Sequence, residues 1–364
     1  MGKYKICVYA ICKNEEKYVE RWVKAVSEAD LIVVTDTGST DKTVELLRKN
    51  HVVVYEEKII PWRFDVARNI AMDHIPDDVD ICVSNDLDEI FEPGWREKLE
   101  QVWEKKHTRA RYMFSWSYHE DGSPDKQFVM EKIHRRHGFR WIHPVHEVLE
   151  YKGEDPDCYA DIYSITLNHH PDTTKSRGQY LPLLELSAKE NPTDDRTIFW
   201  LGREYMYYGK FIESINTLRA YLALESAVWE EERSAAYRFI GICYLNLGIK
   251  EEAKAYFYRA IGECPYVREP YLAMARFAFD EKDWRLLYFV TERALSGTMK
   301  TGSYLMETEC YGPDLEDYAA IACYFMGLYG KAVEHETRAL SLEPENERLI
   351  TNLKLIMEKV EAYR

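Results

Sequence analysis

The sequence predicts two domains of different class: an α/β domain over residues 1–185 and an all-α domain over residues 186–364. Three observations lead to this prediction. Strand-like and helix-like segments alternate in the first half, as in a sheet covered by helices. The composition changes near Asn191-Pro192, and only helical patterns follow. These helices come in pairs whose small residues recur at a fixed spacing, which is typical of a solenoid.

Apolar runs rich in β-branched residues alternate in the first half with segments of helical periodicity. The apolar runs predict strands at 5–12, 31–36, 51–59, 80–91, 111–120, 128–136 and 161–170. The periodic segments predict helices at 14–29, at 63–75 and, after a cap at Ser39 or Thr40, up to residue 50. The extra strands at the end of this half favour a mostly parallel sheet with an antiparallel edge.

The clearest helical repeat runs from residue 237 to 265 and resembles the tetratricopeptide repeat. Small residues such as Gly241 and Ala253 stand where two helices would cross, and Gly248 stands between them. Further copies are expected at 198–218, 271–294 and 319–344, with an insertion at 297–313 and a capping helix at 347–364. An ordinary helical bundle is the alternative, but the clearest copy fits too many positions of the repeat to favour it.

Composition and charge exclude several classes of protein. The 364 residues are 46% apolar, which is typical of globular domains, and their net charge of −15 argues against binding to nucleic acids or anionic membranes. No apolar run approaches the roughly 18 residues that span a bilayer, and the N-terminus lacks the features of a secretory signal. The eight cysteines form no Cys-x-x-Cys pair, so we expect reduced, buried thiols in a cytoplasmic protein.

The stretch Asp86-Leu87-Asp88 follows an apolar run directly. In an extended chain these two carboxylates face the same side, where each raises the pKa of the other unless a cation lies between them. Oxygen ligands suit Mg²⁺ or Mn²⁺, which commonly bridge to substrate phosphates. Such a triplet is common by chance, and a solvated loop is the alternative. Its position after a strand of an α/β region favours a ligand site.

Four short motifs, AICKNEE, VVTDTGSTDKT, ARN and NDLDE, occur in this order in the first 90 residues. Together they resemble family 2 glycosyltransferases of the GT-A fold, over residues 3 to about 175. A GT-A domain followed by tetratricopeptide repeats is similar to the bacterial peptide glycosyltransferases of the sublancin S-glycosyltransferase type.

The resemblance implies a UDP-sugar donor and a divalent metal, Mn²⁺ or Mg²⁺. Asp86 and Asp88 would form the DxD motif, with Asp88 the firmer metal ligand and Asp86 nearer the ribose or sugar. Asp36 would contact the uracil or ribose. The residues implied beside the nucleotide are Ala10, Asn14, Asp36, Arg68 and Asp86. From the residues alone, the alternatives are a helix cap for Asp36 and a solvated surface residue for Arg68.

The same resemblance implies a base and a further metal ligand. Glu147 matches the acidic residue of the family's ED motif, but His146 replaces the first acid, so either residue is a candidate base for an inverting transfer. His169 or His170 would reach the metal or the diphosphate. Each histidine taken alone is more often structural. Two basic residues in the next loop, Lys175 and Arg177, are candidates to close over the diphosphate or are plain surface charge.

Three functions remain open at this stage. The first is transfer of a hexose to a peptide or protein side chain, with the repeats holding the acceptor or forming a homodimer. The second is transfer to a cell-envelope glycan or a lipid-linked sugar. The third, from another class, is a catalytically inactive repeat scaffold, against which the intact Asp86, Asp88 and Glu147 argue. A nucleotidyltransferase has less support because no triphosphate-binding loop is found.

Overall fold

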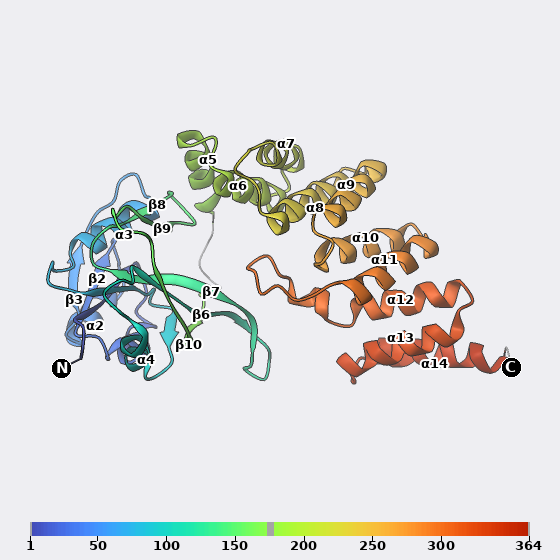
Figure 1. Cartoon of the computed structure of the whole chain (residues 1–364), viewed down its shortest axis with the longest axis horizontal. Coiled ribbons are helices and arrows are strands. Elements are labelled where there is room, and N and C mark those ends of the chain that lie inside the picture. Colours follow the sequence, from blue (N-terminus) through green and yellow to red (C-terminus); the bar gives the residue numbers. More distant parts are fainter. Residues whose placement is uncertain (1, 173–177, 363–364) are drawn as a thin grey trace. The chain divides into compact units, whose positions relative to one another are not determined.

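A computed structural model of the chain describes residues 2–172 and 178–362 (Figure 1). The chain forms two compact units, residues 1–187 and 188–364, with helix α5 (Tyr180–Glu190) running across the boundary. Each unit is described by itself below. Lys175 and Arg177 lie outside the described residues.

The first unit is built on an eight-stranded mixed sheet in the order β3-β2-β1-β4-β7-β6-β10-β5. Strands β3, β2, β1 and β4 are parallel to one another, β7 is antiparallel to both β4 and β6, and β10 is parallel to β6 and antiparallel to β5. The strands are β1 (Ile6–Cys12), β2 (Leu31–Asp36), β3 (Val53–Glu56), β4 (Ile81–Ser84), β5 (Glu89–Phe91), β6 (Arg109–Tyr118), β7 (Pro124–Arg135) and β10 (Tyr159–His169). A separate hairpin joins β8 (Phe139–Ile142) to β9 (Val148–Tyr151).

Strand β1 is apolar throughout because both faces of the sheet are covered. Ile6 and Val8 face a core that contains Trp22 of α1 and Trp95 of α4. The alternate residue Tyr9 faces a second core, which α3 and the β8–β9 hairpin complete. The helices are α1 (Val19–Val26), α2 (Thr43–Lys49), α3 (Phe64–Asp73) and α4 (Trp95–Val102).

Three expectations about this unit are wrong in detail. The single strand expected at 80–91 is two strands, β4 and β5, which lie at different places in the sheet and are separated by a turn. Antiparallel pairing is not confined to an edge, because β7 lies inside the sheet. Neither Ser39 nor Thr40 caps α2. The helix begins at Thr43, and the backbone N–H of Thr43 donates to Asp41 Oδ1 at 3.0 Å.

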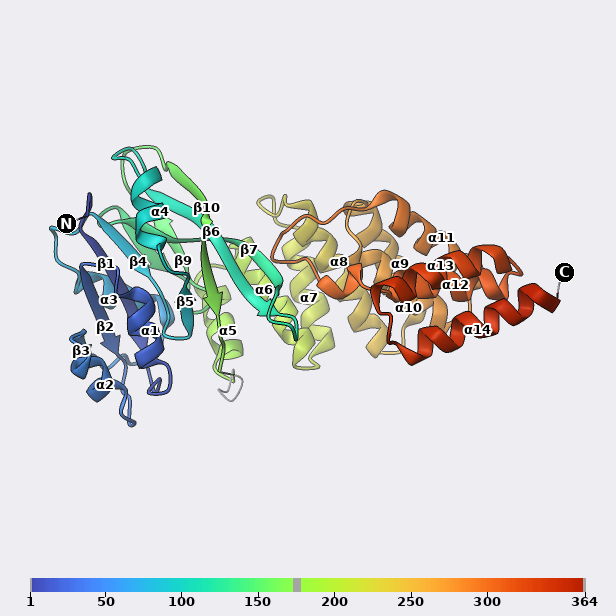
Figure 2. The ribbon, with the colours of Figure 1, turned by 90° about the horizontal axis from the view of Figure 1, so that it is seen from below.

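The second unit is a stack of helix–turn–helix pairs, in which successive helices lie side by side (Figure 2). The pairs are α6 (Asp195–Tyr207) with α7 (Phe211–Leu222), α8 (Glu230–Asn246) with α9 (Lys250–Glu263), α10 (Glu269–Asp280) with α11 (Trp284–Gly297), and α12 (Asp314–Phe325) with α13 (Tyr329–Leu342). The last helix, α14 (Glu347–Ala362), packs on α13. Residues 298–313, called the insertion below, join α11 to α12 and contain the short 3₁₀ helix η1 (Thr308–Tyr311).

Glycines make the close crossings and the turns of these pairs. A Cβ on Gly202 would lie 2.6 Å from the Leu218 side chain, and one on Gly241 would lie 2.6 Å from the Phe257 ring, so only glycine fits where the helices touch. Gly248, in the turn between α8 and α9, has a φ of 75°, which L-residues rarely adopt. The four predicted copies, the insertion and the capping helix are therefore present. The predicted fold class, an α/β domain followed by a tetratricopeptide-like helical domain, is confirmed.

The cysteines agree with the expectation of buried thiols. All eight belong to the described part of the chain and none is in a disulfide; seven are buried and Cys158 is half-buried. Among the helices of residues 2–172 and 178–362, none has the length and apolar character needed to cross a membrane.

Candidate active site

A large cavity lies at the carboxyl ends of the sheet strands in the first unit. Its volume is about 1090 Å³, and its wall includes Cys12 at the end of β1, Asp36 at the end of β2 and the turn after β4. This is the edge at which ligands bind in α/β sheets. The predicted site residues that line it are Asn14, Asp36, Arg68, Asp86, Asp88 and His169. Four others, Ala10, His146, Glu147 and His170, are not part of the wall.

Two loops form one end of the cavity, and short polar side chains tie them together. Asp36 is buried and accepts hydrogen bonds from the backbone N–H groups of Gly38 (3.0 Å) and Ser39 (2.9 Å). Asn14, with a φ of 55°, accepts from the N–H of Thr40 (2.7 Å) and donates its own N–H to Ser39 Oγ (2.8 Å). The end of the cavity is thus fixed before any ligand binds. Ala10 lies deeper in β1 and faces the apolar core.

Asp86 lies between two basic side chains. Arg68, from α3, donates two hydrogen bonds to its carboxylate, at 2.8 and 2.9 Å, and Lys132 Nζ from β7 lies 3.6 Å away. Burial by itself raises the pKa of Asp86, but the charges of Arg68 and Lys132 hold that pKa below its usual value. The sequence argument that Asp86 needs a metal ion is therefore only partly right, because protein cations already compensate its charge.

Lys132 and Glu89 belong to the same network, and the sequence did not single them out as a pair. Lys132 Nζ lies 3.1 Å from Glu89 Oε1, and the other Glu89 oxygen accepts the backbone N–H of Asp86 at 3.0 Å. Burial lowers the pKa of Lys132, but the carboxylates of Glu89 and Asp86 raise it above its usual value. A lysine within the strand predicted at 128–136 was the available signal. Which carboxylates it faces depends on the pairing of β7 with β4, which the sequence did not define.

Asp88 faces away from this network and toward His169. Its Oδ2 lies 3.5 Å from His169 Nε2 at the cavity wall. The His169 ring stacks on Trp116, with 4.6 Å between ring centroids, and its Nδ1 is buried without a hydrogen-bond partner among the described residues. The next residue, His170, points to the other side of the strand end and stacks on Tyr118. The structure thus brings His169, and not His170, to the side chain of Asp88.

The donor atoms at this place suit a hard or borderline divalent cation. Within the described ranges, no group of three or more His, Cys, Asp or Glu side chains is arranged to hold a metal ion. Asp88 and His169 supply one carboxylate and one imidazole beside a cavity that is large enough for a nucleotide. Mg²⁺ and Mn²⁺ commonly take only one or two protein ligands and complete their coordination with substrate phosphates and water. The two residues therefore fit a cation that arrives with a diphosphate.

Glu147 and His146 lie in the loop between β8 and β9. The Glu147 carboxylate accepts a hydrogen bond from Arg68 Nε, so Arg68 joins Glu147 to Asp86. His146 has a φ of 52°, and its ring meets the edge of Tyr180 at 5.6 Å between centroids. Tyr180 lines the cavity, whereas neither candidate base does. Glu147 is connected to the site through Arg68, and His146 through Tyr180.

Comparison with known proteins agrees with the motifs. Residues 7–148 match the family model described as glycosyl transferase family 2, which identifies this part of the chain as a domain of that family. No curated protein matches the chain.

Several solved structures of helical-repeat proteins are similar to about half of the chain. The APC/C hetero-tetramer Cut9-Hcn1 is 14% identical with a TM-score of 0.38; the match covers 50% of this chain but only 33%, about a third, of that one. YrrB, described as a TPR protein with an unusual peptide-binding site, is 13% identical with a TM-score of 0.40, covering 49% of this chain and 84% of that one. The MamA protein is 18% identical with a TM-score of 0.37, covering 47% and 87%. At these scores the likeness is weak, and the repeat assignment depends on the helix pairs and glycine contacts described above.

Proposed function

We propose that this protein is a metal-dependent glycosyltransferase that transfers a hexose from a UDP-sugar, with inversion, to a peptide or protein side chain. The observation that carries the proposal is the meeting of Asp88, His169 and the Asp36 turn around one cavity, in a domain of glycosyl transferase family 2. A catalytically inactive scaffold does not require Asp88 and His169 at a cavity. The cavity is large enough for a UDP-sugar.

The uridine would lie against the Asp36 turn and Asn14, above Ala10. Asp86, held ionised by Arg68 and Lys132, would accept a hydrogen bond from a ribose or sugar hydroxyl. Asp88 and His169 would hold Mn²⁺ or Mg²⁺, which, when bound, neutralises the charge that develops on the UDP leaving group. His170 stays outside this assignment because its ring lies against Tyr118.

In the transfer, an acceptor heteroatom attacks the anomeric carbon while the bond from that carbon to the UDP oxygen breaks. The acceptor's proton passes to the base, and UDP leaves with the bonding electron pair. Glu147 and His146 both remain candidates for the base. The hydrogen bond from Arg68 orients the Glu147 carboxyl group. A pH profile of kcat/KM for Glu147→Gln and His146→Gln distinguishes them, because only loss of the base removes the limb on which rate rises with pH.

A peptide acceptor is favoured over a glycan by the attached helical repeats, since extended solenoid surfaces commonly bind peptides. Transfer to a cell-envelope glycan or lipid-linked sugar is the second candidate. Incubating the protein with UDP-hexoses, Mn²⁺ and parallel pools of peptides and glycans, followed by mass spectrometry, separates the two. A hexose found only on glycans would eliminate the peptide acceptor.

The activity itself is tested by release of UDP from a panel of UDP-hexoses with Mn²⁺. We expect slow hydrolysis by the wild type and a loss of about 100-fold or more in Asp88→Ala, since a metal ion contributes several kcal/mol to such a step. Asp78→Asn is the matched control, because it removes a surface carboxylate of the same domain that pairs with Lys5 and does not line the cavity. Absence of hydrolysis with every donor, or equal rates in Asp88→Ala and wild type, would rule out the proposal.

A further inference from the structure

The insertion, residues 298–313, lies across the first helices of three successive pairs in the helical unit. Its Tyr304 ring stacks on Trp200 of α6, with centroids 5.5 Å apart and planes 14° from parallel. The Tyr304 hydroxyl donates to Glu232 of α8 at 2.5 Å. Further along, the backbone N–H of Glu307 donates to Glu269 Oε1 of α10 at 2.9 Å. One extended segment thus contacts α6, α8 and α10 in turn.

Charged side chains take part in this contact. Arg238 of α8 donates two hydrogen bonds to the Glu307 carboxylate, at 3.0 and 2.6 Å, which is the paired geometry that gives arginine its selectivity for carboxylates. The Arg203 guanidinium lies 3.8 Å from the centroid of the Trp200 ring, so this ring contacts both a cation and Tyr304. The helices therefore present one aromatic position and one cationic position to the insertion.

The exposure of the two sides differs. Glu232, Arg238 and Glu269 on the helices are buried, each with 7 or 8% of its surface exposed. On the covering side, none of residues 298–309 is buried, and they form no helix or strand before η1. Charged residues are rarely buried unless paired, and replacing such pairs by apolar residues commonly costs no stability. The polar contacts that Tyr304 and Glu307 make are those of a recognition surface under an occupant, whereas Leu305, Cys310 and Tyr311 of the insertion pack against the apolar clusters of the helix pairs.

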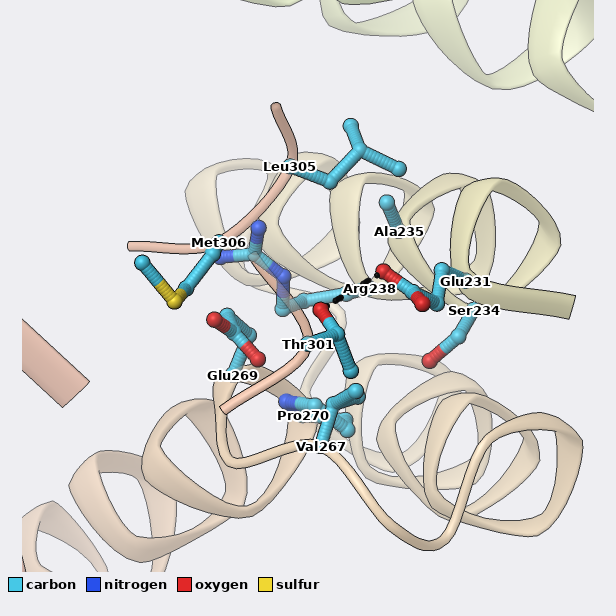
Figure 3. A pocket seen from close by; sticks show the side chains of 10 residues that line it. All are labelled: Glu231, Ser234, Ala235, Arg238, Val267, Glu269, Pro270, Thr301, Leu305 and Met306. Atoms are coloured by element: carbon cyan, nitrogen blue, oxygen red, sulfur yellow. Dashed lines mark hydrogen bonds between the residues drawn. The ribbon is translucent and has the colours of Figure 1, made fainter. Parts of the chain in front are cut away.

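The packing under the insertion is also incomplete. A cavity of about 20 Å³, room for one water molecule, lies between the helices and the insertion, as Figure 3 shows. Its wall contains Glu231, Arg238 and Glu269 from the helices and Thr301, Leu305 and Met306 from the insertion. Glu231, Ala235 and Arg238 are spaced so that they share one side of α8. That side of α8 faces the insertion, and Thr301 Oγ1 donates to Glu231 across the cavity at 3.1 Å.

We propose that α6, α8 and α10 form a peptide-binding groove, which the insertion occupies as an internal ligand. The peptide that fits carries an aromatic residue three positions before a carboxylate, as Tyr304 and Glu307 do. The ring of the aromatic residue stacks on Trp200, and its hydroxyl donates a hydrogen bond to Glu232. The carboxylate pairs with Arg238. A partner or acceptor with this pattern binds by displacing the insertion.

The first test asks whether the groove opens when its internal ligand is weakened. A fluorescent peptide of residues 298–313, with Cys310→Ser, is titrated by anisotropy against the full chain without nucleotide sugar. We expect Tyr304→Ala/Glu307→Ala to bind it at least tenfold more tightly than wild type, in which the groove is occupied. Lys300→Ala is the control, because Lys300 is an exposed charged residue of the same segment, and its ammonium lies 5.2 Å from the ring centroid of Tyr311 within the insertion itself. Equal binding by wild type and the double variant, or no binding by either, would overturn the proposal.

The second test does not depend on the double variant folding. Arg238→Glu reverses the charge that holds Glu307. We expect this variant to bind a peptide carrying Glu307→Arg at least tenfold more tightly than the native peptide. If Arg238→Glu shows no preference between the two peptides, Arg238 does not recognise the carboxylate at position 307 of the peptide, and the groove assignment is wrong.

Discussion

Two buried carboxyl groups, one in each unit, have opposite environments. Asp86 in the first unit is paired with Arg68 and Lys132, whose charges hold its pKa below its usual value although burial opposes this. Glu336 in α13 is fully buried, and both of its oxygens are without a hydrogen-bond partner among the described residues. Burial and the neighbouring Asp317 raise the pKa of Glu336 to about 8. Two basic partners keep the pKa of Asp86 low, whereas burial and the carboxylate of Asp317 outweigh the nearby Arg348 and raise that of Glu336.

The first unit contains a network of paired charges, whereas Glu336 of the helical unit is a buried carboxyl group outside any such network in the described part of the chain. The first unit joins Arg68, Asp86, Lys132, Glu89 and Glu147 in one network of ion pairs beside the cavity. Most of the helical unit is held by apolar packing over glycine and alanine contacts instead. Changes to charge should therefore matter most in the first unit, and changes to shape in the second.

The largest expected effect on stability is that of Arg68→Ala. The substitution leaves Asp86 and Glu147 without the guanidinium that serves both, and breaking a buried ion pair in this way costs about 3–5 kcal/mol. Urea unfolding followed by circular dichroism measures the loss. Arg68→Lys keeps the charge but loses the paired hydrogen bonds, and should cost less. If Arg68→Ala unfolds at the wild-type urea concentration, the network does not stabilise the unit.

The next effect concerns pH and Glu336. Because its folded pKa of about 8 is above the usual 4.5, its contribution to stability is complete below about pH 4.5 and is lost as pH rises through 8. We expect the thermal midpoint of the helical unit to fall by about 5 °C or more between pH 6 and 9, and Glu336→Gln to flatten that fall.

The neighbouring His335 contributes with the same sign. Burial lowers its pKa, but hydrogen bonds to Glu316 and Glu292 raise it above the usual value, so its stabilisation is also lost with rising pH. Glu336→Gln should therefore reduce the pH dependence without removing it. Glu334→Gln, an exposed position of the same helix, is the control. A pH dependence in Glu336→Gln equal to that of wild type would show that Glu336 does not titrate in this range.

The smallest expected effect tests shape in the helical unit. Gly241→Ala places a methyl group 2.6 Å from the Phe257 ring and should cost about 1–3 kcal/mol of unfolding free energy. Gly262→Ala in α9 meets no atom within 4 Å, and should stabilise by up to about 1 kcal/mol through helix propensity. Differential scanning calorimetry of the pair measures both. If both substitutions stabilise, the crossing at Gly241 is not as tight as its geometry indicates.

The sequence predicted the order of most elements and all four repeat copies, because local periodicity and turn glycines carry that information. The site was less accessible. The argument that Asp86 and Asp88 share a face assumed an extended chain, but residues 87 and 88 form a turn. Asp86 therefore points to Arg68 and Lys132, and Asp88 to His169.

Other features of the site depend on contacts between residues far apart in the sequence. Lys132 reaches Asp86 and Glu89 only because β7 pairs with β4. Strand alternation indicates that just one of His169 and His170 can face the cavity, but which one depends on the register of β10 against β6 and β5. The types of residue in the site could thus be predicted from the sequence, but the contacts between them could not.

The most direct test of the central claim is a calorimetric titration of UDP into the protein with and without Mn²⁺, for wild type, Asp88→Ala and Asp78→Asn. The account predicts that Mn²⁺ strengthens UDP binding at least tenfold in wild type and in Asp78→Asn, and that Asp88→Ala loses this gain while still binding UDP weakly through the Asp36 turn. Equal UDP affinity with and without Mn²⁺ in the wild type, or an undiminished gain in Asp88→Ala, would contradict it.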